Sequence, residues 1–558
     1  MGLDIYWIGL LVLAPLVAIV AGHETIRKLA ARATMSAEKK QQQEKGGEVE
    51  VDPLEDEAAK FQRTFLSVYL LAVGSEWLQN PFTYSLFRNE KTLDEATVAN
   101  LYIGTYVAAA AAALVAGHLT DRLGRRRACL AFCGAHSLAA ASVCFDGLPV
   151  LVLGRVLGGV ALALLWTSFE SWAVAEYNAR GLARSSLSLG AMLARVTTAK
   201  CVAAIAAGVL GHYVVLALGS KIHPFILSVA LDVFAAALMM RTWNENWGIS
   251  RRTATATDAK ANADANDIKA AEAVEAQDHV SSSGEEEGKA TTTSLWDPRV
   301  WAMSFVASSF EGTIFLFMFF WPETLQDAHD REHPGLVGDG IPHGVIFASF
   351  MAIMALGALF FNFVAAGSGD RKAAAAEEEE EEETRWRRTL LNLSPTRLLE
   401  GALVVSAVCF MVAAFVRGEA ALFVSFLALE VCNGIYVPSV AYHRGTIVTD
   451  DARARVYSLM NIPLFVFVVI ALRMAGGGGG GGGNGADAAH ATAGWEAIFL
   501  MCAALLLVAA VVTLLYLHAE SGKPGGYSEI HGQDLASTRQ VLGDTHAHAS
   551  FQLPRGRN

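Results

Sequence analysis

Several charged side chains lie within stretches of the chain that are otherwise apolar. An ionisable group near the centre of a bilayer costs about 2.5 to 3.5 kcal/mol on insertion scales, so each one needs a partner, a water-filled cavity or a function. In the stretch 154–172, Arg155, Trp166 and Glu170 fall within about 60° of one another at 100° per residue. A cation, an aromatic ring and an anion therefore share one face of a predicted helix. This face either lines a polar cavity or holds neighbouring helices in place.

A second polar group lies in the stretch 61–87. Glu76, Gln79 and Asn80 are spaced i, i+3 and i+4, which places them on one helix face. Pro81 follows at once and is expected to kink the helix beside this face. The group is interpreted either as the lining of a cavity or as a polar clamp between helices.

The stretch 187–211 carries two cations, Arg195 and Lys200. Five residues of separation place them about 140° apart on a helix, so they cannot face one point. Arg195 is the better candidate for a wet cavity, because Lys200 can extend its ammonium along the helix or pair elsewhere. The other polar groups inside apolar stretches are Asp232, Glu311, Glu430, Asn433 and Asn461. Carboxylates and arginines are roughly matched in number, so ion-pair scaffolding is the alternative to contact with a ligand or a proton.

The composition indicates a membrane protein. The chain has 558 residues, of which 53% are hydrophobic and 18% charged, with a mean hydropathy of +0.36. Such a chain is too apolar for an ordinary soluble protein of this length. The net charge of -12 comes largely from the runs 258–287 and 377–383, which are expected to be solvated loops without bearing on nucleic acid.

A spanning helix needs about 20 apolar residues to cross about 30 Å of hydrocarbon. The chain supplies runs at 3–22, 61–87, 97–117, 128–145, 149–174, 187–211, 223–240, 299–321, 343–365, 397–416, 420–441, 455–474 and 494–517. With the first run outside the core, the other twelve divide six plus six around a long polar stretch. The predicted fold is an all-α polytopic membrane protein with two six-helix halves and an extra N-terminal helix.

The predicted organisation follows from these runs. It comprises an N-terminal hydrophobic helix (1–22), a cytoplasmic linker (23–60), a first six-helix half (61–241), a cytoplasmic polar linker (242–297), a second half (298–517) and a cytoplasmic tail (518–558). Alternate loops are rich in lysine and arginine, which keeps them cytoplasmic and turns the N-terminus outward. The first run carries an aspartate and no basic residue near its start, so a retained helix is favoured over a signal peptide.

The basic loop between the third and fourth runs reads as a tight cytoplasmic turn. Its predicted working residues are Gly117, Asp121, Arg122, Gly124 and Arg125. The first glycine allows close helix approach, the aspartate caps or pairs at a helix end, and the second glycine permits the turn. The arginines hold the loop on the cytoplasmic side.

Catalytic motifs are not found in the sequence. There is no nucleophile elbow, phosphate-binding glycine loop or metal-ligand cluster, so an enzyme is not expected. The seven cysteines lie in apolar stretches without a C-x-x-C pair, and are interpreted as small core residues, neither disulfides nor metal ligands. No cofactor is expected.

Two motifs resemble the major facilitator superfamily. The loop 117–126 resembles its G-x-L-x-D-R-x-G-R-R signature, and Arg155 with Gly159 resembles the R-x-x-x-G motif of its fourth core helix. The resemblance implies movement of small solutes by alternating access. The arginine of that helix is associated in the superfamily with coupling or substrate handling.

Within the superfamily, five segments together resemble the molybdate-anion transporter family. These segments are 61–79, 154–172, 310–321, 344–351 and 430–439. The resemblance implies uptake of molybdate, a tetrahedral dianion, through a bilayer that is expected to be the plasma membrane. Fixed cations and hydrogen-bond donors suit such an oxyanion.

Site residues follow from this expectation. The predicted substrate-binding residues are Arg155, Arg195, Trp166, Gln79, Asn80 and Asn433. The predicted coupling or ion-pair residues are Glu76, Glu170, Glu311 and Glu430, with a proton as the candidate coupling ion. Two alternatives stay open: a carrier of another small anion or organic solute, and a facilitator-like sensor that binds a ligand without net flux.

Overall fold

A computed structural model describes residues 5–20, 22, 53–182, 185, 189–247, 298–334, 340–374, 393–447, 463–474 and 487–517. These residues form helices and short connections, with no strand among them. The all-α prediction is therefore confirmed. Most of the predicted linkers 23–60 and 242–297, the tail 518–558 and the start of the predicted span 455–474 lie outside the described residues.

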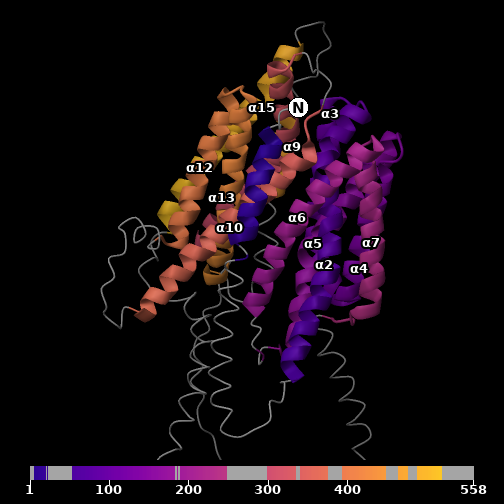
Figure 1. The fold of residues 1–558 in the computed structure, drawn as a ribbon, viewed down its shortest axis with the longest axis vertical. Helices are drawn as coiled ribbons and strands as arrows, with labels where there is room; N and C mark the ends of the chain where they lie inside the picture. Colours follow the sequence, from indigo (N-terminus) through magenta and orange to yellow (C-terminus); the bar gives the residue numbers. More distant parts are fainter. Residues whose placement is uncertain are drawn as a thin grey trace, which may run out of the picture.

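The helices form two bundles (Figure 1). The first bundle contains α2 (Pro53–Ser85), α3 (Glu95–Leu123), α4 (Arg125–Ser142), α5 (Leu148–Ala179), α6 (Leu189–Leu218) and α7 (His223–Thr242). The second contains α9 (Pro298–Glu332), α10 (His343–Ala374), α12 (Pro395–Phe415), α13 (Glu419–Ile447), the helix Pro463–Met474 and α15 (Asp487–Tyr516). Nine of the described helices are long and apolar enough to cross a membrane.

Helix α2 differs from its predicted span. It begins at Pro53, eight residues before the apolar run, because proline at the first turn followed by Glu55 and Asp56 favours a helix start. It also continues through Pro81 to Ser85, where a π-helical turn, η1 (Leu86–Glu90), follows.

Two helix starts carry side-chain caps. Asp94 precedes α3 and accepts hydrogen bonds from the backbone N–H of Thr97 at 3.0 Å and from its hydroxyl at 2.6 Å. The bond from the Thr97 hydroxyl, helped by the backbone bond, lowers the pKa of Asp94. Ser394 caps α12 by accepting from the N–H of Arg397 at 3.3 Å, with Pro395 at the first helical position.

The two bundles meet along α6 and α10. A Cβ placed on Gly344 of α10 would lie 2.3 Å from the carbonyl oxygen of Gly208 on α6, so only glycine permits this approach. Two aromatic pairs continue the contact: Tyr102 meets Phe319 with ring centroids 4.8 Å apart, and Trp77 meets Phe347 at 5.6 Å. We call this contact between the bundles the seam, and the side predicted to face outward the outer side.

The N-terminal helix Ile5–Val20 lies across the seam. Trp7 packs edge-on against His212 of α6, with centroids 5.4 Å apart, and Tyr6 packs against Phe423 of α13 at 4.9 Å. Its opposite face, which includes Leu11 and Val12, is exposed and apolar. The helix thus contacts both bundles.

The cysteine prediction holds in part. Cys129, Cys133, Cys409, Cys432 and Cys502 are buried and Cys201 is half-buried. Cys144 is exposed, which makes the prediction of a core position wrong for this residue. It lies two residues beyond the end of α4, in the turn that follows this helix.

Candidate functional site

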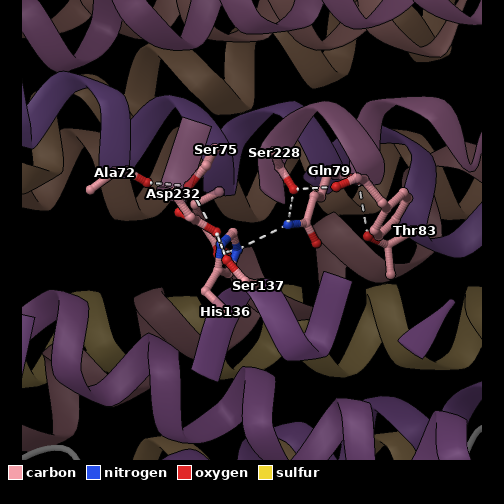
Figure 2. Close-up of polar contacts among 10 residues, drawn as sticks. Ala72, Ser75, Gln79, Thr83, His136, Ser137, Ser228 and Asp232 are labelled. Carbon is pink, nitrogen blue, oxygen red and sulfur yellow. Dashed lines mark hydrogen bonds and ion pairs between the residues drawn. The ribbon is translucent and has the colours of Figure 1, made fainter. Parts of the chain in front are cut away.

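A buried histidine lies between two carboxylates inside the first bundle, and Figure 2 shows it beside one of them, Asp232. His136 of α4 places Nδ1 2.7 Å from Oδ2 of Asp232 on α7, and Nε2 2.9 Å from Oε2 of Glu76 on α2. The side chain of His136 is 4% exposed and that of Asp232 is 0% exposed. Ser75 donates to Oδ1 of Asp232 at 2.6 Å and Ser137 donates to its Oδ2 at 3.3 Å. We call this group the His136 cluster.

Gln79 belongs to the same cluster. Its Nε2 lies 3.0 Å from Nε2 of His136 and donates to the hydroxyl of Ser228 at 2.7 Å. Gln79 therefore joins α2, α4 and α7, which corresponds to the clamp interpretation of this patch. Asn80, the next residue, is half-buried.

The hydrogen bonds around Nε2 of His136 admit two proton arrangements. If Glu76 is ionised, its carboxylate can only accept, so Nε2 of His136 must donate to it. The amide nitrogen of Gln79 can only donate, so Nε2 must accept from it. The first arrangement makes the ring an imidazolium and turns the oxygen of Gln79 toward it. The second leaves Nε2 without a proton and puts that proton on Glu76. The two arrangements contain the same number of protons, so a proton can pass between His136 and Glu76 while both residues stay on their helices.

Glu76 connects the cluster to a cation. Its side chain is 28% exposed, in contrast to Asp232, and it attracts Arg155 of α5 electrostatically. The guanidinium of Arg155 lies over the ring of Phe87, 5.4 Å from the centroid. Its buried Nε has no hydrogen-bond partner among the residues that the structure describes.

Arg155 lies beside the seam. It interacts electrostatically with Tyr102 and Tyr106 of α3, and these rings pack against Phe319 and Phe315 of α9 in the second bundle. The positive charge of Arg155 therefore belongs to the first bundle and lies next to the seam.

Trp166 and Glu170 continue the same face of α5. Trp166 is 45% exposed and packs against Phe315 with centroids 6.0 Å apart. Glu170 is exposed and attracts Lys200 of α6, whose ammonium lies over Trp77, 5.8 Å from the ring centroid. Lys200 therefore joins the predicted stripe, although the sequence favoured Arg195.

Arg195 lies elsewhere. At 1.5 Å per residue it is about 9 Å from the start of α6, whereas Arg155 is about 10 Å from the start of α5, and these helices run in opposite directions. Arg195 donates to Oε1 of Gln62 at 2.6 Å. The structure therefore does not bring the two predicted arginines together around one small anion.

The second bundle holds the remaining predicted residues. Glu311 accepts hydrogen bonds from the hydroxyl of Tyr436 at 3.1 Å and from Arg444 at 3.2 Å, as an ion pair. Glu430 is fully buried and accepts a hydrogen bond from Asn433 at 3.0 Å, while its Oε1 has no hydrogen-bond partner within the described part of the chain.

The basic loop closes the inner end of the first bundle. Gly124 has a φ of +108°, and a Cβ there would lie 2.5 Å from Oε1 of Glu245. The backbone N–H of Arg125 donates to the carbonyl of Asn246 at 2.9 Å, and its guanidinium donates to the carbonyl of Ser171 at 3.3 Å. Gly117 and Arg122 are exposed, and the side chain of Asp121 lies outside the described residues. Sequence reasoning missed Glu245, which follows α7.

A cavity of about 240 Å³ lies at the outer end of the bundles. Its lining includes Arg88 but also Glu323, Asp327 and Asp330, so its charge disfavours an oxyanion. Tyr84 of α2 donates a hydrogen bond to Glu323 of α9 beside it, which joins the two bundles on this side.

Sequence reasoning also missed His136. The inventory of buried charges counted carboxylates and cations, whereas a histidine is neutral in that count. The available signal was a lone histidine in the apolar run 128–145, combined with the lone carboxylate of the run 223–240.

Comparison with known proteins agrees with this architecture. Residues 31–368 match a major facilitator family model described as sugar transporters with 12 TM. The chain is 27% identical to the molybdate-anion transporter of Takifugu rubripes over 490 residues, covering 82% of this chain and 88% of that protein. It is 28% identical to the molybdate-anion transporter of Danio rerio, covering 82% and 87% of the two chains. These relatives confirm the resemblance to that family.

Solved structures show the same fold. A peptide transporter of the POT family aligns with a TM-score of 0.57 at 10% identity, over 84% of this chain and 99% of that one. A D-xylose-proton symporter aligns with a TM-score of 0.54 at 12% identity, over 83% and 99% of the two chains. The chain is a multi-span membrane transporter that belongs to the major facilitator superfamily, in the family described as sugar transporters with 12 TM.

Proposed function

We propose that this chain imports molybdate, or a closely similar oxyanion, across the plasma membrane by alternating access. The observation that carries the proposal is Arg155, a guanidinium beside the seam whose buried Nε lacks a hydrogen-bond partner. A guanidinium suits a tetrahedral oxyanion because its planar fork donates two parallel, charge-assisted bonds. The names of the relatives from Takifugu rubripes and Danio rerio supply the choice of molybdate.

A proton is the coupling ion that the His136 cluster supports best. An anion at Arg155 takes up the positive charge that otherwise stabilises ionised Glu76. Glu76 and His136 then hold a proton more readily, because negative charge nearby favours the protonated form. The histidine is surrounded and kept in place by Asp232, Gln79, Ser75, Ser137 and Ser228. Import of the dianion thereby brings a proton with it.

Alternating access requires the outer contacts to open. Tyr84 and Glu323 join the bundles there, and Gly208 and Gly344 allow close contact along the same seam. Rocking of the bundles about the seam would expose Arg155 first to the outer side and then to the inner side. Contacts of this kind, made and broken as bundles tilt, are what alternating access demands.

The first experiment measures molybdenum accumulation from trace molybdate in cells that lack molybdate uptake, with the protein at the cell surface quantified. We expect saturable uptake that excess sulfate leaves largely intact. Uptake abolished by sulfate would instead indicate a carrier of a broader class of anions. Ligand binding without accumulation would indicate the sensor, and accumulation of an unrelated solute would indicate a different carrier.

The matched pair Arg155→Ala and Arg195→Ala tests the site. Arg155→Ala is expected to abolish uptake at an unchanged surface level, since the variant loses the cation beside the seam. Arg195→Ala is expected to retain uptake, because Arg195 is bonded to Gln62 near the opposite side of the membrane. Normal uptake by Arg155→Ala would refute the assignment.

A further inference from the structure

Three potential metal ligands meet at the outer ends of α9 and α13. His329 lies in the last turn of α9, His333 directly follows the last residue of that helix, and Glu419 is the first residue of α13. The backbone N–H of His333 still donates to the carbonyl of His329 at 2.9 Å, which continues the helical spacing. Nδ1 of His329 lies 3.0 Å from Oε1 of Glu419, and Nε2 of His333 lies 3.4 Å from its Oε2. One ligand atom from each of the three residues lies within 4.8 Å of the others. The sequence analysis had found no metal-ligand cluster, because the carboxylate comes from a helix 86 residues further along the chain.

We propose that His329, His333 and Glu419 form a binding site for a divalent transition-metal ion, with Zn²⁺ the best match. Two imidazole nitrogens and one carboxylate oxygen are ligands that zinc accepts, with water in the fourth position. Tetrahedral bonds of about 2.0 to 2.1 Å separate ligand atoms by about 3.3 Å. Each imidazole nitrogen lies near that separation from one oxygen of Glu419, which is Oε1 for His329 and Oε2 for His333.

The site is largely pre-formed. The side chain of Glu419 is 6% exposed, and its backbone N–H donates to Oε1 of Glu332 at 2.9 Å, which fixes the start of α13 against α9. The arginines nearest in sequence to these ligands have other partners: Arg331 is bonded to Asp327 and Arg417 to Glu496. The carboxylate of Glu419 therefore faces the two imidazoles.

An entry path is present. His333 is 47% exposed, whereas His329 is 14% exposed. An ion can reach His333 from the outer solution and is then held by the two more buried ligands. Hard cations such as Ca²⁺ and Mg²⁺ prefer all-oxygen sites, so the imidazole pair selects against them.

The position of the site suggests what the metal does. Glu323, which accepts the hydrogen bond from Tyr84 across the seam, lies on α9 six residues before His329, or about 9 Å along the helix. A metal bridging α9 to α13 would hold the outer end of α9 against its own bundle. Under the proposed transport cycle, outer Zn²⁺ would slow the movement of that end and so reduce uptake, whereas binding itself does not depend on the transported solute.

The test uses purified full-length protein in lipid nanodiscs, stripped of metal and titrated with Zn²⁺ in a calorimeter. We expect one saturable site that His329→Ala, His333→Ala and Glu419→Gln each weaken at least tenfold. His223→Ala is the matched control, because His223 lies at the start of α7 on the same side and contacts the carbonyl of Ser220 instead. The control should bind Zn²⁺ like the unchanged protein.

A second measurement distinguishes loss of the metal site from misfolding of a variant. Co²⁺ replaces Zn²⁺, and its visible absorption reports nitrogen and oxygen ligands in a tetrahedral site. We expect this spectrum in the unchanged protein and in His223→Ala, and its loss in His333→Gln at an unchanged melting temperature without metal. Equal Zn²⁺ affinity in the unchanged protein and all three ligand variants, or no cobalt spectrum in the unchanged protein, would overturn the proposal. Because neither readout involves transport, a failure here is distinct from a failure of the proposed molybdate uptake.

Discussion

The two bundles treat buried charge in different ways. In the first bundle, His136 lies between Asp232 and Glu76, and an imidazole ring can take up or release a proton. In the second bundle, Glu311 is paired with Arg444, and a guanidinium keeps its proton at any pH that a protein tolerates. The first arrangement can change its charge during a cycle, whereas the second is a fixed pair. Under the proposed coupling, the His136 cluster of the first bundle carries the proton, whereas the Glu311–Arg444 pair of the second bundle keeps its charge.

The sharpest test of this comparison replaces one residue in each bundle. His136→Gln should lower proton-driven molybdate uptake by about 100-fold, the low end of what a proton-transfer group contributes. Glu311→Gln should lower it by about fivefold at most, because a partly exposed ion pair is worth about 0.2 to 1 kcal/mol. Initial uptake rates, with and without an inward proton gradient, measure both. Equal losses of uptake in the two variants would contradict the distinction between the two bundles.

Glycines at helix crossings allow a second test. Gly344 meets Gly208 across the seam, whereas Gly434 meets the carbonyl of Met354 inside the second bundle, where a Cβ would lie 2.1 Å away. Each change to alanine should cost about 1 to 3 kcal/mol of stability by overpacking. Gly344→Ala should also reduce the uptake rate per folded molecule, because it separates surfaces that must slide. A Gly434→Ala variant with a lower melting temperature and an equally slow rate would contradict this view.

The outer contact predicts a smaller effect. Tyr84→Phe removes a hydrogen bond to a carboxylate, worth about 1.5 to 3 kcal/mol, and should open the outer side more often. Labelling of Ser85→Cys in the outer cavity by a membrane-impermeant thiol reagent should accelerate about tenfold, with Cys144→Ser as the background that removes the exposed native thiol. An unchanged labelling rate would show that other contacts keep this side closed.

The two capped helices offer the smallest and most controlled comparison. Asp94→Ala and Ser394→Ala should each lower stability by about 0.5 to 2 kcal/mol at neutral pH. The hydrogen bonds from Thr97 lower the pKa of Asp94, so its contribution is present above the unfolded value of about 3.9 and is lost as pH falls through the lower folded value. Melting temperatures across that acid range should therefore converge for Asp94→Ala and its parent. The effect of Ser394→Ala should not vary with pH, since a hydroxyl does not titrate there.

The sequence carried most of the fold but only part of the site. Length and apolarity located the helices, because spanning a bilayer demands about 20 apolar residues whatever surrounds them. The partners of a buried polar side chain depend on which helix faces meet, and the sequence does not give these faces. The clamp formed by Gln79 with His136 and Ser228 is therefore seen only in the structure. The depth of each arginine in the membrane could, however, be predicted from the sequence. Counting residues from the ends of two oppositely directed helices separates Arg155 from Arg195 without any coordinates.

The helix Ile5–Val20 affects how the carrier meets its lipid annulus. Its inward face fills the groove between α6, α10 and α13, and its outward face presents apolar side chains such as Leu11 and Val12 to acyl chains. Lipid tails on this flank therefore touch a thirteenth helix instead of the seam itself. On this flank, a lipophilic molecule dissolved in the bilayer would therefore meet the N-terminal helix before it reached the seam.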